Sequence, residues 1–442
     1  MSRTEVDISN LIDESKLQRF HWLILGLCGF VTVIDGYDLV AMGLVVPTLS
    51  EQWGLGPEAF STVLSAALVG VLLGSAIAGR LGDLIGRKWT LVIMLAIAAV
   101  FMTLTAVAET MNELIIYRFL TGVGAGGSIP VAIAFTAEYM PAAQRNVLVA
   151  IMYSGAPLGS VLGAFTGPTA IDWFGWHGIF WFGGALTALA CVALAVMLPE
   201  SLRYLVIRNA SRERIESLIN RLNPSVSLAQ NATLSINEAS HGRTAMAELL
   251  GSGRRQVTLT LWALFLGTQF VIFYLGLWLP TVFVRAGLSL DIALYVVAIY
   301  SLGGVFGGPI CGWLSDRYGA QRVLALVYPT AAVAILGVFG VLTTSSLWIV
   351  AALAGVTVIG CSICLGGLSA TLYPTHARST AVGLALGVGR FGSIVAPLIG
   401  GAVVASGSNF VFFAIASFGS LMCSLGILML IRLTKAQKIS SS

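Results

Sequence analysis

The sequence predicts an all-α membrane protein with twelve transmembrane helices. Of its 442 residues, 57% are apolar and only 10% are charged, whereas a soluble domain usually carries about 25% charged residues. The apolar residues form runs of about 20, the length that a helix needs to cross roughly 30 Å of hydrocarbon. These runs are continuous and do not alternate, which indicates a helical bundle.

Twelve candidate spans cover residues 20–43, 58–79, 89–108, 113–137, 147–169, 178–198, 258–284, 291–314, 322–342, 346–370, 379–405 and 409–431. The polar segment 199–257 separates the first six spans from the last six. We therefore expect an N-terminal six-helix bundle over 1–198, a cytoplasmic linker over 199–257 and a C-terminal six-helix bundle over 258–442. The polar N-terminal flank lacks the short apolar region of a signal peptide, so we expect the first span to be retained.

The basic residues predict the orientation. With a cytoplasmic N-terminus, all but three of the 24 Lys and Arg residues fall on the cytoplasmic side. Arg285 lies on the opposite side, and Arg118 and Arg390 lie within spans. The positive-inside rule then places both termini in the cytoplasm of a multi-pass protein of the plasma membrane, the inner membrane in a bacterium. The net charge of +4 reflects this rule, and we expect no binding of nucleic acid.

The two halves of the chain repeat one another. The loop after the second span, 79–88, reads G-R-L-G-D-L-I-G-R-K, and the loop after the eighth, 312–322, reads G-W-L-S-D-R-Y-G-A-Q-R. A second repeat pairs E-Y-M-P at 138–141 with L-Y-P at 372–374, each followed by an arginine. Two similar halves favour alternating access, with a substrate site at their interface near the membrane midplane.

Several motifs carry a family resemblance over the whole chain. The 79–88 loop, R-F-L-T-G-V-G-A-G-G at 118–127, G-A-P-L-G at 155–159 and L-P-E-S at 198–201 resemble the motifs of the Major Facilitator Superfamily. The resemblance implies that fold, with two pseudo-symmetric six-helix bundles. Within it, D-G-Y-D-L-V at 35–40 is similar to the first-helix marker of the aromatic acid:proton symporter family, and closer to its benzoate-type members. This implies import of a small aromatic carboxylate, of benzoate or hydroxybenzoate type, by proton symport.

Three charged residues within spans are the candidate proton-coupling groups: Asp35, Asp38 and Arg118. The two aspartates are three residues apart, so they share one helix face. At 1.5 Å per residue they lie roughly 22 and 27 Å from the cytoplasmic edge, and Arg118 lies at roughly 23 Å. Two such close carboxylates resist double ionisation, and Arg118 can pair with either one. The alternatives are a capping pair near the surface and a permanent structural ion pair.

Arg390 is the candidate ligand for the substrate carboxylate. It lies about 17 Å into its span, and no acidic residue lies within spans seven to twelve except Asp291 and Asp316 at their ends. A guanidinium fork matches a carboxylate in two-point fashion. Backbone carbonyls that satisfy the arginine are the alternative. Side chains that could complete the site are Tyr37, Gln269, Phe270, Tyr274, Trp278 and Tyr300, although aromatic residues are common in any membrane helix.

A second set of charges lies at the predicted cytoplasmic ends of the spans. Its symmetric placement suggests salt bridges that close the inner side in one state and so bias a two-state equilibrium. The resemblance implies this gating part for the loop aspartates, and interfacial charge that only sets topology is the alternative. The predicted gating residues are Asp83, Arg87, Glu138, Arg145, Asp316 and Arg378.

Other classes of function are less compatible with the sequence. Cys361 and Cys364 form a C-x-x-C without a second pair, which indicates packing rather than a metal site. We find no nucleophile–base set and no phosphate loop, so we expect no enzyme and no cofactor. The main alternative is a porter for another small organic anion or for a sugar, since L-P-E-S-L-R-Y at 198–204 resembles sugar porters. We expect a monomer in the lipid bilayer.

Overall fold

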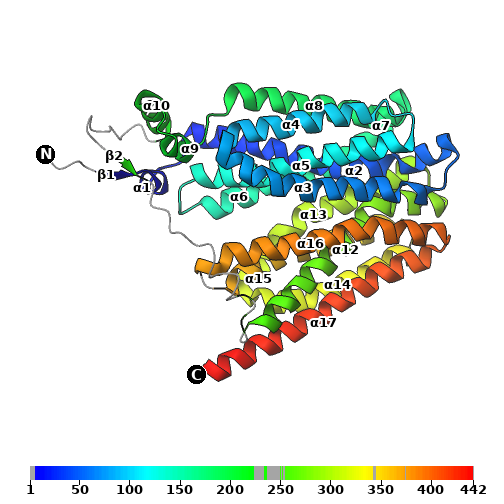
Figure 1. Cartoon of the computed structure of the whole chain (residues 1–442). Helices are drawn as coiled ribbons and strands as arrows, with labels where there is room; N and C mark the ends of the chain where they lie inside the picture. Colours follow the sequence, from blue (N-terminus) through cyan, green and yellow to red (C-terminus); the bar gives the residue numbers. More distant parts are fainter. Residues whose placement is uncertain are drawn as a thin grey trace. The chain divides into compact units, whose positions relative to one another are not determined.

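The structure is a computed structural model that describes residues 5–222, 233–235, 249, 251, 254–341, 345–373 and 375–441. Apart from two three-residue strands it is helical (Figure 1). The elements up to the linker are β1 (Glu5–Asp7), α1 (Ile8–Asp13), α2 (Arg19–Trp53), η1 (Pro57–Phe60), α3 (Ser61–Ile85), α4 (Arg87–Thr105), α5 (Met111–Tyr139), α6 (Arg145–Tyr153), α7 (Gly155–Phe174), α8 (His177–Met197), α9 (Leu202–Ile207), α10 (Arg212–Leu222) and β2 (Thr233–Ser235). The remaining helices are α12 (Arg255–Arg285), α13 (Leu290–Tyr318), α14 (Ala320–Gly340), α15 (Leu347–Thr371), α16 (Thr375–Ala405) and α17 (Asn409–Ser441).

The prediction of twelve membrane-spanning helices is confirmed. Within the described residues, 12 helical segments are long and apolar enough to cross a membrane. The fifth span is divided into α6 and α7 at Ser154, where Gly155 and Pro157 follow and favour a break in a helix. The Thr32 hydroxyl of α2 donates to the carbonyl of Met152 at 2.6 Å, so the last turn of α6 is held against α2.

The described chain forms two compact units. Unit 1 comprises Met1–Asp38, Val69–Gly159 and Phe180–Ser240, and unit 2 comprises Leu39–Leu68, Ser160–Ile179 and His241–Ser442. Helices α2, α3 and α7 therefore contribute to both units. One end of each of these three helices packs with the C-terminal helices, so the compact units do not follow the midpoint of the sequence.

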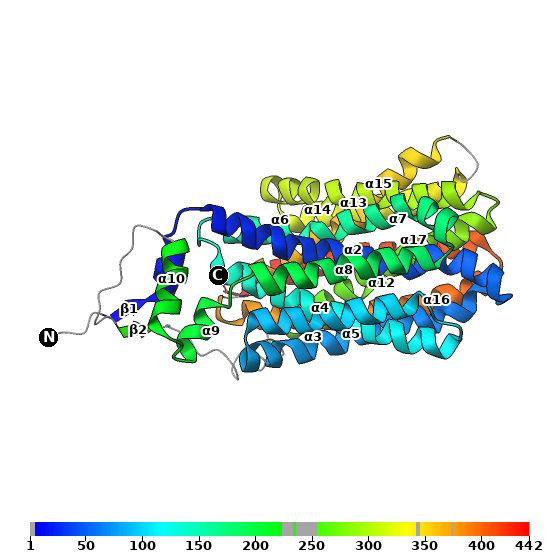
Figure 2. The ribbon, with the colours of Figure 1, turned by 90° about the horizontal axis from the view of Figure 1, so that it is seen from above.

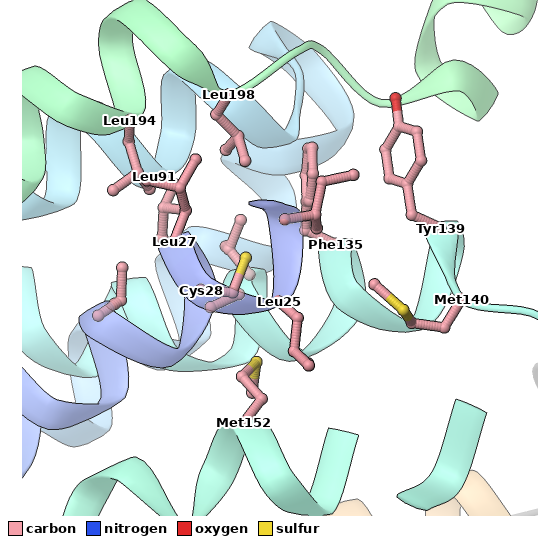
Figure 3. Close-up of a cluster of buried hydrophobic side chains, with 14 of the residues drawn as sticks. Leu25, Leu27, Cys28, Leu91, Phe135, Tyr139, Met140, Met152, Leu194 and Leu198 are labelled. Carbon is pink, nitrogen blue, oxygen red and sulfur yellow. The ribbon is translucent and has the colours of Figure 1, made fainter. Parts of the chain in front are cut away.

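The core of unit 1 is made by apolar side chains from α2, α4, α5 and α8. Figure 3 shows Cys28, Leu91, Phe135 and Leu194 among the side chains that meet there. All four are fully buried. Their burial fixes which face of α2 turns toward the other helices of the unit, and this rotation also sets the direction of the charged side chains farther along α2.

A small cap covers one end of unit 1, which we call the linker end because α9 and α10 leave α8 there (Figures 1 and 2). Strand β1 pairs in parallel with β2. Ile8 and Ile12 of α1 are buried in the same cluster as Ile215 and Leu218 of α10. The cap thus joins the N-terminal segment to the segment after the sixth span.

Unit 2 is built mainly from the six C-terminal helices. Helix α12 packs on α16 and α17, α13 packs on α15, and α14 packs on α15 and α17. The Trp278 indole N–H donates to the carbonyl of Pro397 at 3.2 Å, and the Arg285 guanidinium donates to the carbonyl of Val404. These two bonds fix the relative height of α12 and α16.

Candidate functional site

A buried ion pair joins the first and fourth spans in unit 1. Arg118 Nη1 lies 2.6 Å from Asp38 Oδ1, and Arg118 Nη2 donates to the Asp38 carbonyl at 3.0 Å. The side chains of Arg118 and Asp38 are 2% and 8% exposed. Of the two aspartates expected as partners for Arg118, Asp38 is the one that it contacts. In an ion pair so well sealed from water, removal of either charge leaves the other uncompensated.

Aromatic side chains enclose this ion pair. The Arg118 guanidinium lies over the Phe180 ring at 5.6 Å, which is a favourable cation–π distance. Tyr37 is 1% exposed, and its ring lies 5.9 Å from that of Phe182. Among the described residues, Arg118 Nε has no hydrogen-bond partner, so the guanidinium retains one unused donor.

Asp35 and Asp38 line a small internal cavity of unit 1. The cavity measures about 10 Å³ and is also lined by Thr121, Ser128 and Thr187. A space of this size is at the lower limit of what one water molecule needs. The two carboxylates therefore lie on one face of α2, beside hydroxyl groups from α5 and α8.

Arg390 lies near the middle of α16 in unit 2. Its side chain is half-buried, and it makes no ion pair with any described residue. One helical turn after Arg390, on the same face, the backbone carbonyl of Ile394 accepts a hydrogen bond from the Ser65 hydroxyl of α3 at 2.9 Å. Helix α3 therefore contacts α16 at this point. The guanidinium is therefore a cation in mid-span that an anionic ligand would neutralise.

Gln269 of α12 lies beside this part of α16. A Cβ atom built on Gly389 would be 3.1 Å from Gln269 Cγ, so α12 and α16 approach closely at this height. The Ser362 hydroxyl of α15 donates to Gln269 Oε1 at 3.4 Å. An amide, a hydroxyl and a guanidinium thus project from three neighbouring helices of one unit.

The predicted aromatic ligands in unit 2 occupy well-packed positions. Tyr274 stacks between Phe270 and Phe412, with ring centroids 5.3 and 4.5 Å away. Trp278 is fully buried and bonded to α16. Tyr300 lines a small apolar cavity with Phe283 and Phe413, among others. The hydroxyls of Tyr274 and Tyr300 are buried and have no partner among the described residues.

Three of the four predicted gating charges of the N-terminal half meet at the linker end of unit 1. Arg87 lies 3.3 Å from Asp83 and 3.4 Å from Glu138. Glu138 also accepts a hydrogen bond from the Ser201 hydroxyl at 2.5 Å. Arg87 therefore joins the loop after α3 to the end of α5.

Glu200 completes this network, and the sequence did not single it out. Its Oε1 atom accepts the backbone N–H groups of Lys88 at 3.0 Å and Ser201 at 2.8 Å. The N-cap of α4 is Gly86, which has φ of 96° and no capping side chain of its own. Glu200 therefore caps α4 from 112 residues away, where a carboxylate is also favoured by the helix dipole. Burial raises the pKa of Glu200, and the backbone hydrogen bonds oppose this.

The other gating candidates have different surroundings. Arg145 forms an ion pair with Asp13 of α1 and donates to the carbonyl of Met140 at 3.1 and 3.2 Å. Asp13 was not predicted. Asp316 is exposed and has no ion-pair partner in the described part of the chain. The side chain of Arg378 lies outside the described residues.

Within unit 2, the helix ends from the N-terminal half pack tightly on the C-terminal helices. A Cβ atom on Gly43 of α2 would be 2.7 Å from the carbonyl oxygen of Leu277, and one on Gly401 of α16 would be 2.7 Å from Ser61 Cβ of α3. The Phe165 ring of α7 lies 5.8 Å from the Tyr295 ring of α13. This end of the unit is closed by small residues that permit close helix approach.

The family assignment follows from a match over most of the chain. A family model described as Major Facilitator Superfamily matches residues 28–386. The chain belongs to the Major Facilitator Superfamily. As a member of this superfamily it is a multi-pass membrane transporter and not an enzyme, as the sequence predicted.

Individual comparisons agree with this membership. This Major Facilitator Superfamily chain is 34% identical to the 4-hydroxybenzoate transporter PcaK of Pseudomonas aeruginosa, over 92% of this chain and 91% of the relative. It is 30% identical to a benzoate transport protein of Acinetobacter baylyi, over 91% and 87%. The structure of the xylose transporter XylE from E. coli, in a partially occluded inward-open conformation, matches with a TM-score of 0.72 at 18% identity, over 92% of this chain and 97% of that one. The last match shows the fold alone.

Proposed function

We propose that this protein is a secondary active transporter that imports a small aromatic carboxylate, of benzoate or hydroxybenzoate type, by proton symport through alternating access. The relatives support the aromatic acid, since two of them are a 4-hydroxybenzoate transporter and a benzoate transport protein. The buried Asp38–Arg118 pair is the observation that best supports proton coupling.

The coupling step follows from the chemistry of this ion pair. While Asp38 is ionised, Arg118 holds it through its side chain and its backbone carbonyl. Protonation of Asp38 removes the charge that balances Arg118, so the unbalanced guanidinium adds to the positive potential that attracts the anionic substrate. Asp35, on the same face of α2, is the second proton site. A proton and an anionic substrate are thus bound in a linked manner.

Arg390 is the proposed ligand of the substrate carboxylate. It lacks an ion-pair partner among the described residues, and a planar guanidinium binds a carboxylate through two parallel hydrogen bonds. Gln269 of α12 lies against Gly389, the residue before Arg390. The roles of Tyr37, Phe270, Tyr274, Trp278 and Tyr300 as aromatic neighbours of the substrate ring remain predictions.

Two sets of contacts are proposed to alternate during transport. The charges at the linker end, Asp83, Arg87, Glu138 and Arg145 with Asp316 and Arg378, would close the cytoplasmic side in one state. The small-residue contacts of Gly43 and Gly401 would close the other side. We further propose domain limits of 1–198, 199–257 and 258–442, cytoplasmic termini, a bacterial inner-membrane location and a monomeric carrier.

A sugar porter is the alternative function, because L-P-E-S-L-R-Y at 198–204 resembles sugar porters. A sugar is neutral, however, and would leave the charge of Arg390 unbalanced in mid-span. A carrier for another small organic anion would use the same arginine, so it must be separated by experiment.

Uptake of labelled 4-hydroxybenzoate and benzoate by cells that express the protein tests this function. We expect uptake above that of cells without the protein, and we expect a protonophore to abolish accumulation. Uptake of xylose but not of either acid would overturn the aromatic acid assignment. Acid uptake that a protonophore does not change would overturn symport.

A further inference from the structure

The Ser362 hydroxyl is directed away from its own helix, toward a side chain of α12. Hydroxyls in mid-helix commonly bond to a carbonyl three or four residues earlier. Thr357 of the same helix does so with Leu353, and Thr268 of α12 does so with Leu264. Ser362 instead donates to Gln269 Oε1 of α12. Polar side chains at this depth in a membrane are unfavourable. Because the Ser362 hydroxyl does not bond within its own helix, helix formation does not explain the Ser362–Gln269 pair.

The pair is not fully satisfied by its own contact. The separation of 3.4 Å is at the long end for a hydrogen bond between side chains. The Gln269 amide has two N–H donors, and neither has a hydrogen-bond partner among the described residues. Both side chains are half-buried. The amide and the hydroxyl are therefore available to a ligand.

Arg390 lies at the same height as this pair. The bond from Arg285 to the Val404 carbonyl fixes the register of α12 and α16. Gln269 precedes Arg285 by 16 residues and Arg390 precedes Val404 by 14, so the two differ in height by only about 3 Å at 1.5 Å per residue. The close approach of Gly389 to Gln269 agrees with this register.

We propose that Gln269 and Ser362 bind a ring hydroxyl of the substrate, and that the protein therefore prefers hydroxylated aromatic acids to benzoate. This rests on the proposed function, with the carboxylate on Arg390. The amide donates to the ring hydroxyl oxygen, and the Ser362 oxygen accepts its proton. Benzoate leaves this polar pair without a partner, and sites built to bind a hydroxyl discriminate against ligands that lack it.

Purified protein with Ser362→Ala or Gln269→Leu tests the proposal through binding of 4-hydroxybenzoate and benzoate. Wild-type protein should bind 4-hydroxybenzoate more tightly. One lost hydrogen bond should weaken that binding by about two- to tenfold and leave benzoate unchanged, so the preference falls in both variants. Thr357→Val is the matched control, because that hydroxyl bonds within α15, and it should leave the preference intact.

The outcomes separate this proposal from the function beneath it. Equal binding of the two acids by wild-type protein would overturn the preference while leaving the aromatic acid function in place. Equal weakening of both acids in the variants would show a packing role for the pair and would also overturn it. Binding of neither acid would contradict the proposed function itself.

Discussion

Replacing Asp38 with asparagine removes one charge from an ion pair that is almost sealed from solvent. Arg118 is 2% exposed and its Nη1 lies 2.6 Å from Asp38 Oδ1. Asparagine keeps an oxygen that can accept this hydrogen bond, but it cannot neutralise the guanidinium. Loss of one partner from a buried pair commonly destabilises a protein by about 3–5 kcal/mol. We expect reduced thermal stability and complete loss of proton-driven accumulation.

The assay compares accumulation with exchange in vesicles that contain purified Asp38→Asn protein. Accumulation against a gradient requires the proton, whereas exchange of labelled for unlabelled substrate does not, so exchange should persist. Adding Arg118→Leu should recover part of the lost stability, because no uncompensated charge remains. Asp172→Asn, at an exposed carboxylate of α7, is the control and should behave as wild type. Normal accumulation by Asp38→Asn would refute the proposed coupling.

Three further predictions address the other parts of the account. Arg390→Lys should weaken substrate binding by over tenfold, since a point charge replaces a two-point fork; titration calorimetry with exposed Arg432→Lys as control measures this, and unchanged affinity would return Arg390 to a structural role. Gly43→Val should abolish uptake while binding persists, because its side chain meets the Leu277 backbone; Gly26→Val on the same helix, where a Cβ meets nothing within 4 Å, should be tolerated. Burial raises the pKa of Glu200 in the folded protein. The contribution of Glu200 to stability is therefore fully present below the unfolded pKa of about 4.5. It is lost as the pH rises through the raised pKa of the folded protein. The unfolding temperature of Glu200→Gln should therefore rise relative to that of wild type as the pH increases. A difference between the two that does not change with pH would contradict this.

The spans could be predicted because a continuous apolar run is visible in the sequence itself. Their ends were less accessible. Helix α2 continues to Trp53, ten residues past the predicted limit at 43, first through the largely apolar residues 44–49 and then through Ser50 and Glu51. Hydropathy reports where side chains favour lipid, and it does not report where helical hydrogen bonding stops.

The charged residues of the candidate site were visible in the sequence, but their partners were not. Counting residues from the cytoplasmic edge placed Arg118 at the depth of both aspartates. Only the rotation of α2 in its packed core determines that Asp38 is the partner of Arg118. Glu200 and Lys88 are 112 residues apart, so no local pattern links this cap to α4. The absence of any capping side chain at Gly86, together with the L-P-E-S motif that contains Glu200, could have prompted a search for a distant carboxylate.

The Ser362–Gln269 contact shows the same limit. Each residue is an ordinary polar member of an apolar span, and Gln269 was a candidate only by its type. Their pairing depends on how α12 and α15 face one another in unit 2. Sequence reasoning finds residues that are chemically unusual for their depth, and packing decides which of them meet.

We expect a proton gradient to drive entry of an aromatic acid through this protein. Accumulation of labelled 4-hydroxybenzoate in proteoliposomes, under an imposed pH gradient with the membrane potential held at zero, measures this. Liposomes without protein correct for passive entry of the protonated acid. With one proton carried per anion, each pH unit should support about tenfold accumulation at a rate that depends on the protein. Uptake that reaches the same level and rate with and without the gradient would contradict the account.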